Sequence, residues 1–452
     1  MDNYNKFLDL RKKYDTFIYE KYEIIENLNN YEIIYYFSIP NLTQFTPKII
    51  IDKNNLTNKN INDNFFEYLI FNIGMIEIIS YVKCTCSKNI IVKAGYLDND
   101  QINWFKKLLF NGLGEFLYRN NITTTQEELF NIESTGKKPK FNINYQGNGN
   151  LIPVGGGKDS NVTLELLKKE YENNTCFIIN PKDANIQCAC IAGYENKTIS
   201  IKRILDKKII ELNNQGFLNG HTPFSAIVAF ISYLCAYLSN KEYIVLSNED
   251  SANQSTVLGT NINHQYSKTY EFENDFNNYT KKYFKINIKY FSLLRPLSEF
   301  QIGMLFSEYK KYHNTFKSCN LGSKEKEWNW CGNCPKCLFV YIILSPFLYK
   351  EELITIFGKD LYEDETLLET FKELLGYSET KPFECVGTYE EVRYAVSLLI
   401  TKLDNNLPYL LKYYKDNYPL YLEENYKTKY NNNNNLDQKF ETIIKEAINK
   451  YV

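Results

Sequence analysis

Arginine and histidine are scarce in this sequence. The chain has 452 residues but only five arginines and three histidines, and its formal net charge is −2. A charge so close to zero argues against a surface that coats nucleic acid or docks on an acidic membrane. A rare arginine is a better candidate for two-pronged anion binding than a common lysine, whose ammonium group is a point charge. We therefore take Arg295 as a candidate clamp for a substrate carboxylate or diphosphate, with a structural salt bridge as the alternative.

Signals for secretion and membrane insertion are also missing. Residues 1–6 do not show the basic-then-apolar order of a signal peptide. No uncharged apolar run reaches the roughly 18 residues that span a bilayer. The nearest, residues 224–238, predicts a buried helix. The 11 cysteines are odd in number and clustered, which favours metal sites and free thiols over disulfides. We expect a cytoplasmic protein without a membrane or nucleic-acid partner.

Length and periodicity predict two or three domains. The first, residues 1–145, is expected to be α+β. Its expected helices lie at 9–30, 65–82 (with Glu77 inside) and 101–119, and its expected strands at 31–37, 48–52 and 90–94.

Residues 146–340 alternate strands and helices, which is the pattern of a parallel sheet covered on both faces. The expected strands are 151–154, 175–180, 198–201, 243–247 and 286–294, and the expected helices are 160–171, 224–238 and 296–309. Residues 341–452 predict helices only. Two capping boxes are expected, Ser298 with Gln301 and Thr388 with Glu391. A final amphipathic helix is expected around residues 440–448, after a solvated asparagine loop at 431–435.

The most informative stretch is residues 151–160, where an apolar run ends in Gly-Gly-Gly-Lys-Asp-Ser. This order predicts a strand, a tight loop and a helix. Consecutive glycines leave backbone N–H groups unobstructed, and the helix start adds the positive end of its dipole. The alternative is a turn that binds nothing. We expect a phosphate cradle made by Gly155, Gly156, Gly157, Lys158, Asp159 and Ser160.

Two common phosphate loops do not fit this stretch. The mononucleotide P-loop requires a glycine where Ile152 stands, and a hydroxyl residue where Asp159 stands. The dinucleotide fingerprint requires a glycine at the position of Ser160. The stretch instead resembles the Ser-Gly-Gly-x-Asp-Ser loop of the PP-loop ATP pyrophosphatases, with Gly155 in place of the first serine. That resemblance implies a grip on the pyrophosphate of ATP while a substrate oxygen attacks the α-phosphate.

Four cysteines have the spacing C-x11-C-x2-C-x2-C. Four thiolates complete a tetrahedral Zn²⁺ shell without an open position, which indicates a structural site. An iron–sulfur cluster and four unrelated thiols are the alternatives. The spacing resembles the zinc knuckle of 7-cyano-7-deazaguanine synthase, another PP-loop enzyme. The expected ligands are Cys319, Cys331, Cys334 and Cys337, whereas the pairs Cys84/Cys86 and Cys188/Cys190 are expected to be ordinary buried or strand thiols.

The polar stretch that follows the expected strand 243–247 is a candidate magnesium site. Ligands gather at the carboxyl ends of strands in open α/β sheets, and Mg²⁺ takes one or two carboxylates plus phosphate oxygens. Glu249 and Asp250 are the candidate ligands, and the neighbouring Asn248 is a candidate substrate contact. A plain polar loop is the alternative.

The three histidines are candidates for acid–base work near neutral pH. His221 precedes an expected helix, and His264 lies in Asn-His-Gln-Tyr-Ser-Lys. Each is otherwise a hydrogen-bonded loop residue. His313 lies among lysines and tyrosines and is expected to be exposed.

Six motifs in order resemble the UDP-N-acetyl-α-D-muramoyl-L-alanyl-L-glutamate epimerase family of bacterial peptidoglycan synthesis. They are VGGGKDS at 154–160, NGHTPFS at 219–225, SNE at 247–249, NHQYSK at 263–268, LRPLSE at 294–299 and WCGNCPKC at 330–337. NIGMIE at 72–77, GYLD at 95–98 and GLGE at 112–115 extend the resemblance, which covers roughly residues 65–345.

The resemblance implies an isomerase that uses ATP and Mg²⁺ to invert the terminal L-Glu of its UDP-linked substrate, releasing AMP and pyrophosphate. It implies a PP-loop domain with a zinc knuckle at 146–340, between a substrate-side domain at 1–145 and a helical region at 341–452. Inversion needs a base on one face and an acid on the other. We assign these roles to His264 with His221 or Lys268, and Lys268 is also placed on substrate charge with Arg295.

Two other functions are weighed against this one. Another PP-loop adenylating enzyme, acting on tRNA or a deazapurine, shares the loop and the cysteines. A tRNA enzyme should show a basic patch, and the mild acidity of this chain speaks against it. A non-enzymatic zinc scaffold with an inactive ATP site is the other, and the intact Lys158-Asp159-Ser160 speaks against that.

Overall fold

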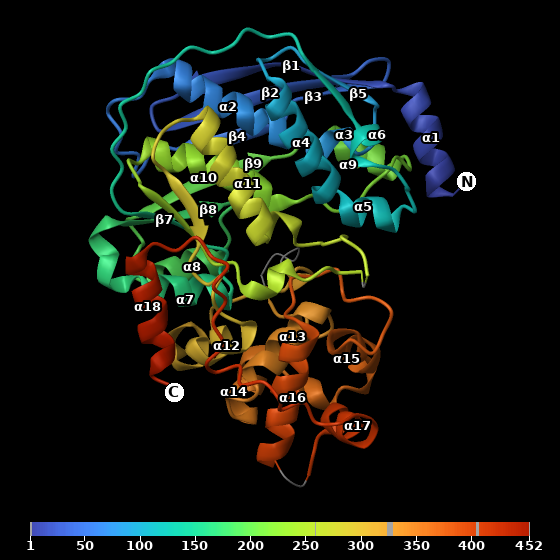
Figure 1. Cartoon of the computed structure of the whole chain (residues 1–452), viewed down its shortest axis with the longest axis vertical. Coiled ribbons are helices and arrows are strands. Elements are labelled where there is room, and N and C mark those ends of the chain that lie inside the picture. The colour runs from blue at the N-terminus through green and yellow to red at the C-terminus, as the bar shows by residue number, and fades with distance from the viewer. Residues whose placement is uncertain (1, 258, 323–328, 404–405, 452) are drawn as a thin grey trace. The chain divides into compact units, whose positions relative to one another are not determined.

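A large mixed sheet organises the residues that the computed structural model describes, which are 2–257, 259–322, 329–403 and 406–451. The strand order is β11-β10-β7-β8-β9-β4-β2-β1-β5-β6, with β3 beside β2. Figure 1 labels β1 to β5 and β7 to β9. Pairs β1–β2, β2–β4 and β4–β9 are antiparallel, and β1–β5, β5–β6 and β7–β10 are parallel. The strands are β1 Thr16–Glu26, β2 Asn30–Ile39, β3 Thr43–Phe45, β4 Lys48–Asp52, β5 Asn89–Val92, β6 Asn131–Ser134, β7 Asn150–Pro153, β8 Asn174–Ile179, β9 Thr198–Ile204, β10 Tyr243–Leu246 and β11 Lys289–Ser292.

The chain forms two compact units, each assembled from separate stretches. The first unit is Met1–Leu151, Ile199–Ile244 and Ile262–Tyr290, and the second is Ile152–Thr198, Val245–Asn261 and Phe291–Val452. First-unit helices are α1 Asn3–Lys13, α2 Asp63–Glu77, α3 Ile79–Val82, α4 Asn99–Gly112, α5 Gly114–Arg119, α6 Gln126–Leu129, α9 Lys207–Asn214, α10 Phe224–Leu238 and α11 Tyr270–Tyr283. Second-unit helices are α7 Lys158–Leu166, α8 Asp183–Ile191, α12 Glu299–Glu308, α13 Pro335–Leu344, α14 Lys350–Phe357, α15 Leu368–Leu375, α16 Tyr389–Leu403, α17 Tyr409–Asn417 and α18 Gln438–Asn449. The predicted domain boundaries at 145 and 340 stay predictions.

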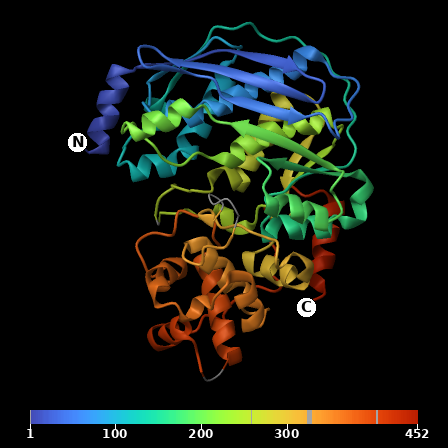
Figure 2. The same ribbon diagram turned by 180° about the vertical axis from the view of Figure 1, so that it is seen from behind.

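In the first unit, helices cover one face of β1, β2 and β4, and the other face of these strands is turned to the viewer in Figure 2. The central helices α2 and α10 pack against each other. Among the described residues one helical stretch, Asp63–Val82, is long and apolar enough to cross a membrane, but 94% of its most apolar window is buried inside the protein. Its charged residue Glu77 is paired with Arg203 at 2.6 Å. This stretch is therefore a core helix, as predicted.

The predicted helix at residues 9–30 is wrong. Helix α1 ends at Lys13, and residues 16–26 form strand β1. Strand β1 has one lysine and three glutamates among seven aromatic or β-branched residues, a composition that favours a pleated strand. The strand buries Phe17 and Tyr19 completely.

The predicted helix at 101–119 is divided at Leu113 into α4 and α5. Leu113 leaves helical geometry, with φ −92° and ψ 7°, between Gly112 and Gly114. Glycine is a weak helix former, so a break between two glycines costs little. The break starts α5 at Gly114, and Glu115, its second residue, belongs to the site described below.

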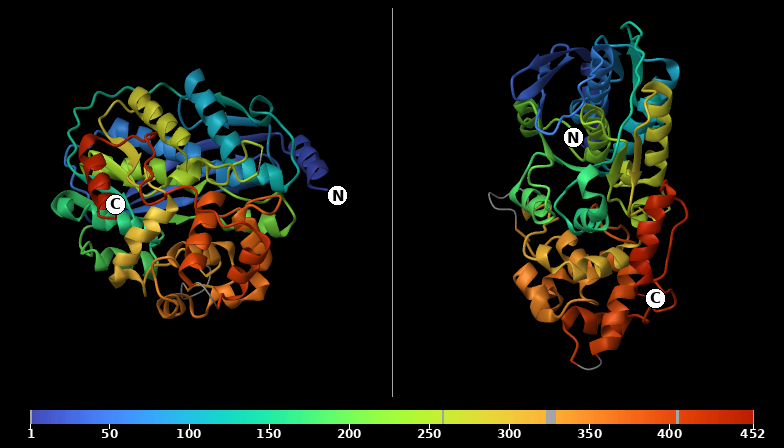
Figure 3. Two further views of the ribbon diagram at one scale, coloured as in Figure 1. Left: turned by 60° about the horizontal axis from the view of Figure 1, so that its bottom comes forward. Right: turned by 90° about the vertical axis from the view of Figure 1, so that its left-hand side faces the viewer.

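The second unit contains no strand after Ser292 in the part of the chain that the structure describes. Helices α13 to α17, orange to red in Figure 3, form its all-helical part. The capping box of Ser298 and Gln301 is confirmed, and Glu391 and Thr388 exchange their predicted cap bonds. Helix α18 is confirmed and packs against α7. The asparagine loop has no regular structure, but Asn431 is tied to the backbone carbonyl of Pro296 at 2.9 Å.

Candidate functional site

The glycine loop lies in the second unit, between β7 and α7, as the sequence predicts. Gly156 has φ +83°, and a Cβ on it would lie 3.0 Å from the backbone of Asn185, so a side chain is excluded there. Gly155 faces open space. Gly157 is the N-cap of α7 and has no side-chain cap bond. The loop therefore presents backbone and a helix start to one side, an arrangement suited to an anion.

Lys158 in this loop is buried between two carboxylates. Its Nζ is bonded to Asp159 and to Glu299, the first residue of α12. Burial alone lowers the pKa of Lys158, but the two facing carboxylates outweigh burial and hold that pKa above its usual range. Burial raises the pKa of Glu299, and Asp159 adds to the effect although Lys158 opposes it. The loop lysine is thus a fixed positive charge held by acidic neighbours.

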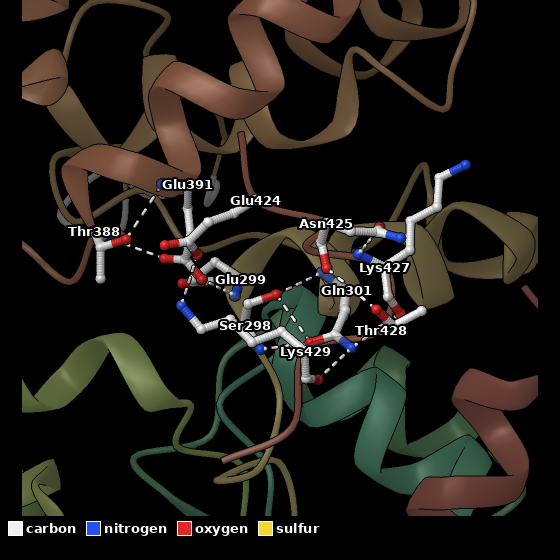
Figure 4. A network of polar contacts seen from close by, with 10 residues as sticks. All are labelled: Ser298, Glu299, Gln301, Thr388, Glu391, Glu424, Asn425, Lys427, Thr428 and Lys429. Atoms are coloured by element: carbon white, nitrogen blue, oxygen red, sulfur yellow. Dashed lines mark hydrogen bonds and ion pairs between the residues drawn. The ribbon is translucent and has the colours of Figure 1, made fainter. Parts of the chain in front are cut away.

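Glu391 extends this network to the C-terminal helices, as Figure 4 shows. Its carboxylate accepts from the backbone N–H of Glu299 and from that of Thr388, both at 2.8 Å. One side chain therefore satisfies the N-terminal ends of α12 and α16, which helix geometry otherwise leaves unpaired. A second buried lysine, Lys381, donates to Gln254 at 3.0 Å, and burial lowers its pKa to about 8.

The candidate magnesium residues lie beyond β10, in the same unit. Glu249 is 3% exposed and accepts from Ser251 at 3.2 Å, and Asp250 accepts from Asn431 at 2.5 Å. Arg295 is fully buried and donates to the backbone carbonyl of Glu249 at 2.8 Å. Arg295 therefore holds the chain that carries Glu249. The carbonyl of Asn248 accepts from Ser292 at 2.7 Å. Metal and substrate contacts of these residues stay predictions.

Two of the predicted catalytic residues meet in the first unit. The rings of His221 and His264 are 4.3 Å apart between centroids. Glu115 joins them: its Oε2 lies 2.5 Å from Nδ1 of His264 and 3.5 Å from Nδ1 of His221. Its other oxygen is paired with Arg119 at 2.6 Å. A histidine that a carboxylate holds through Nδ1 presents Nε2 for proton transfer.

Glycines let the loop of His221 approach α4 and α5. A Cβ on Gly112 would lie 2.7 Å from Pro223, and a Cβ on Gly220 would lie 3.0 Å from the ring of Phe116. Lys83 secures the loop by donating to the backbone carbonyl of Gly220 and to the hydroxyl of Thr222. The position of His221 is therefore set by backbone packing.

The four predicted metal cysteines also meet. The Sγ atoms of Cys319 and Cys334, and of Cys331 and Cys337, are 3.7 Å apart, and those of Cys334 and Cys337 are 3.5 Å apart. A tetrahedral metal with bonds of about 2.3 Å to sulfur needs sulfur–sulfur edges of about 3.8 Å. Backbone N–H groups of Gly322 and Asn333 point to Cys319 and Cys331. The donor set therefore fits a tetrahedral metal ion.

Comparison with known proteins agrees with the motifs. Residues 9–293 match the MurL N-terminal domain and residues 315–428 match the MurL C-terminal domain. The chain belongs to the MurL family. A relative from Xanthomonas oryzae pv. oryzae, named UDP-N-acetyl-alpha-D-muramoyl-L-alanyl-L-glutamate epimerase, is 34% identical over 340 residues, 74% of each chain. A relative of the same name from a Micromonospora species is 34% identical over 325 residues, 71% of this chain and 72% of its own.

Several residues of this MurL chain were not identified from its sequence. Glu115 ends the GLGE motif, yet its partner His264 is 149 positions away, and no local pattern links them. Glu299 and Lys381 are buried ionisable residues of the second unit whose partners Lys158 and Gln254 are 141 and 127 positions away. Glu391 was predicted only as a cap residue with Thr388, and its bond to Glu299, 92 positions away, was not. For Glu115 and Glu299 a signal was present in the sequence, since each closes a motif, GLGE or LRPLSE, on which the predicted resemblance rests.

The remaining predicted residues of the MurL chain have mixed outcomes. Lys268 ends the short helix η3, Tyr266–Lys268, four positions after His264, and its role stays a prediction. The expectation that His313 is exposed is wrong: it is 7% exposed and its Nε2 lies 3.3 Å from the carbonyl of Phe306, because the chain turns inward after η4, Lys310–Tyr312. Of the four C-x-C thiols, Cys84, Cys86 and Cys188 are buried and Cys190 is half-buried, and none of them lies in a strand. Burial raises the pKa of all four.

The buried His221 predicts a pH dependence of stability for this MurL chain. Burial, together with the charge on His264, lowers the pKa of His221 to about 3, although Glu115 opposes the shift. Below pH ~6.5 His221 is protonated in the unfolded chain, whereas it stays neutral in the folded chain. The free energy of unfolding therefore decreases as the pH decreases, by at most about 1.4 kcal/mol per pH unit. Urea unfolding between pH 7 and pH 5 measures this slope. We expect His221→Gln to flatten it, and equal slopes in the two proteins would contradict the buried neutral histidine.

Proposed function

We propose that this chain is an ATP-dependent epimerase that inverts the terminal L-Glu of UDP-N-acetylmuramoyl-L-alanyl-L-glutamate to D-Glu, a step in peptidoglycan precursor synthesis. The observation that carries the proposal is MurL family membership over both halves of the chain, with relatives that bear this activity in their names. A cytoplasmic location is part of the proposal, since the substrate is a nucleotide-linked precursor.

The reason for ATP lies in the acidity of the glutamate α-carbon. A free carboxylate makes this carbon a very weak acid, because a carbanion beside it adds charge to charge. Transfer of AMP to the carboxylate removes that charge, and AMP and pyrophosphate are the products after hydrolysis. The glycine loop supports such a PP-loop role, because it offers backbone donors and the start of α7 to the pyrophosphate, while Asp159 and Glu299 hold the buried Lys158 beneath it.

Inversion then needs proton removal on one face and return on the other. We assign removal to His264, because Glu115 bonds its Nδ1 at 2.5 Å and so fixes the orientation of the ring. His221 is the partner on the other side of the pair, and Lys268 stays an alternative partner. Burial holds the pKa of His221 far below neutral, so its resting imidazole is neutral and must first take up a proton from solvent, which it then returns to the substrate while the proton on His264 leaves to solvent.

Two metal ions belong to the proposal. Magnesium, held by Glu249 and Asp250, would neutralise phosphate charge, and these carboxylates are the oxygen ligands that it prefers. Zinc held by the four cysteines would be structural, because all four positions of the tetrahedron come from protein.

The zinc assignment predicts metal content. The purified full chain should contain about one zinc ion, and Cys334→Ser should lose it and unfold at a lower temperature, because an incomplete shell no longer couples metal binding to folding. Elemental analysis and thermal unfolding measure both. Cys190→Ser, in a half-buried thiol outside the cluster, is the matched control and should keep the metal. Iron with acid-labile sulfide in place of zinc would contradict the assignment.

Turnover in D₂O tests the function as a whole. With the UDP-linked L-Ala-L-Glu substrate, ATP and Mg²⁺, we expect deuterium at the glutamate α-carbon, D-Glu in the product, and AMP rather than ADP. Mass spectrometry and chiral analysis of the hydrolysed product measure these. If AMP forms only when tRNA or a deazapurine is supplied, the epimerase proposal is wrong and the chain is a PP-loop adenylating enzyme for that substrate.

A further inference from the structure

A cleft that is separate from the histidine pair lies in the first unit, at the edge of the sheet where β5 and β6 end. Its volume is about 350 Å³, within the usual range for small-molecule sites. Its walls combine tyrosines with lysines of one short segment: Tyr22, Tyr68, Tyr96, Lys137, Lys138 and Lys140. We call it the lysine cleft. None of the residues assigned above to catalysis, ATP or metal lines it.

The topology explains why a site would form at this edge. Strands β1, β5 and β6 run parallel, so β5 and β6 release their following loops on the same side. The loop after β5 carries Tyr96, and the loop after β6 carries the three lysines. Ligands of open α/β sheets bind outside the carboxyl ends of strands, where such loops converge.

Glycine contacts fix the two loops against each other. Gly136 donates to the carbonyl of Gly95 at 3.1 Å, and a Cβ on Gly136 would lie 2.2 Å from that carbonyl group. A Cβ on Gly95 would lie 2.6 Å from the ring of Phe71, which forms part of the cleft wall. Asn64 of α2 donates to the carbonyl of Lys140 at 3.3 Å. The lysine segment is therefore packed in place over the aromatic wall.

The charges of the lysine cleft suit an anion. Its lining holds three lysines against one acidic residue, Glu67. Among the described residues, these three ammonium groups form no ion pair, so their charge is available to a ligand. Tyrosine faces stack with nucleobases irrespective of sequence, and ammonium groups bind phosphate as point charges. The cleft therefore offers an aromatic face for the base of a nucleoside diphosphate and ammonium groups for its two phosphates.

Helix α4 links the lysine cleft to the histidine pair. It begins three residues after Tyr96 and ends three residues before Glu115. Its 14 residues, at about 1.5 Å each, span about 21 Å. In the proposed substrate the nucleotide and the reacting glutamate stand at opposite ends, and the extended dipeptide alone covers about 7 Å of the distance between them.

We propose that the lysine cleft binds the uridine diphosphate end of the substrate, with the lysines on the diphosphate and Tyr96 against the base. The choice of a UDP-linked ligand rests on the proposed function. The binding of UDP depends only on the residues of the lysine cleft, so its Kd can be measured without enzyme turnover.

Calorimetric titration of the full chain with UDP alone tests this assignment. We expect binding by the wild type, and at least a tenfold higher Kd when Lys137, Lys138 and Lys140 are all changed to alanine. These lysines are exposed, so the fold should tolerate their loss. A matched control changes the exposed Lys12, Lys88 and Lys207 to alanine and should bind UDP as the wild type does. Tyr96→Ala should weaken UDP but not pyrophosphate, which separates the base from the diphosphate.

The outcomes separate the cleft from the proposed function. No UDP binding by the wild type, or equal affinity of the triple variant and its control, would overturn the cleft. UDP binding that depends on the lysines, without deuterium entering glutamate, would overturn the epimerase and keep the cleft. If the epimerase is active, the triple variant should raise KM for the UDP-linked substrate at least tenfold at nearly unchanged kcat, and an unchanged KM would again reject the cleft.

Discussion

Asp159→Ala should lower AMP formation by about 10²–10³-fold, the usual loss when one oriented charged group is removed from an active site. Asp159 bonds the Lys158 ammonium, and its side chain is 26% exposed, so it lies on the open side of the pair. Without it, Glu299 alone holds the buried Lys158, and the ammonium group loses its partner on the open side of the loop. Release of AMP from ATP and the UDP-linked substrate measures the effect.

The variant should remain folded, since Lys158 keeps one buried carboxylate partner. Asp183→Ala is the matched control, because Asp183 also lies in the first turn of a second-unit helix and is exposed. It should release AMP at the wild-type rate. If Asp159→Ala releases AMP at the wild-type rate, the assignment of the glycine loop to ATP is wrong.

His264→Gln should abolish deuterium incorporation while AMP release continues. A positioned base contributes about 10²–10⁴-fold to a proton transfer, and glutamine cannot accept the α-proton. The amide can still donate to Glu115, so the loop should keep its place. Exchange at the glutamate α-carbon and AMP release are measured in the same D₂O reaction.

The separation of the two signals makes this prediction specific. Loss of both AMP and exchange would assign His264 to ATP or substrate binding instead. His313→Gln is the control, because His313 is a buried histidine of the second unit whose ring bonds a backbone carbonyl, which an amide can also do. It should leave exchange unchanged. Retained exchange in His264→Gln would move the base elsewhere.

Much of the fold was predictable where one signal dominates. Helix α10 has the predicted bounds, because fifteen apolar or small residues between Pro223 and a polar turn permit little else. Strands β2 and β4 were predicted from β-branched and aromatic runs. Strand β1 was not, because the charged residues scattered over residues 9–30 suggest an exposed helix, whereas the seven aromatic or β-branched residues within 16–26 favour a strand.

The site was predictable where chemistry is local in sequence. The glycine loop and three of the four cysteines lie within short motifs, so spacing identified them. The histidines were recognised as candidates, but their shared carboxylate was not, since Glu115 reaches them through the break at Leu113 and the close approach of Pro223 to Gly112. Such contacts depend on tertiary packing, which no residue pattern along the chain encodes.

The two hydrogen bonds that the Glu391 carboxylate accepts limit how this chain can be combined with parts of other proteins. This carboxylate completes the start of α12, whose first residue holds the loop lysine, although the two glutamates are 92 positions apart. A chimera that takes its C-terminal helices from another protein must therefore supply an acid in the same place. Without it, the buried N–H of Glu299, the residue that holds the loop lysine, would lose its acceptor, so the C-terminal helices and the glycine loop are expected to be exchanged together or not at all.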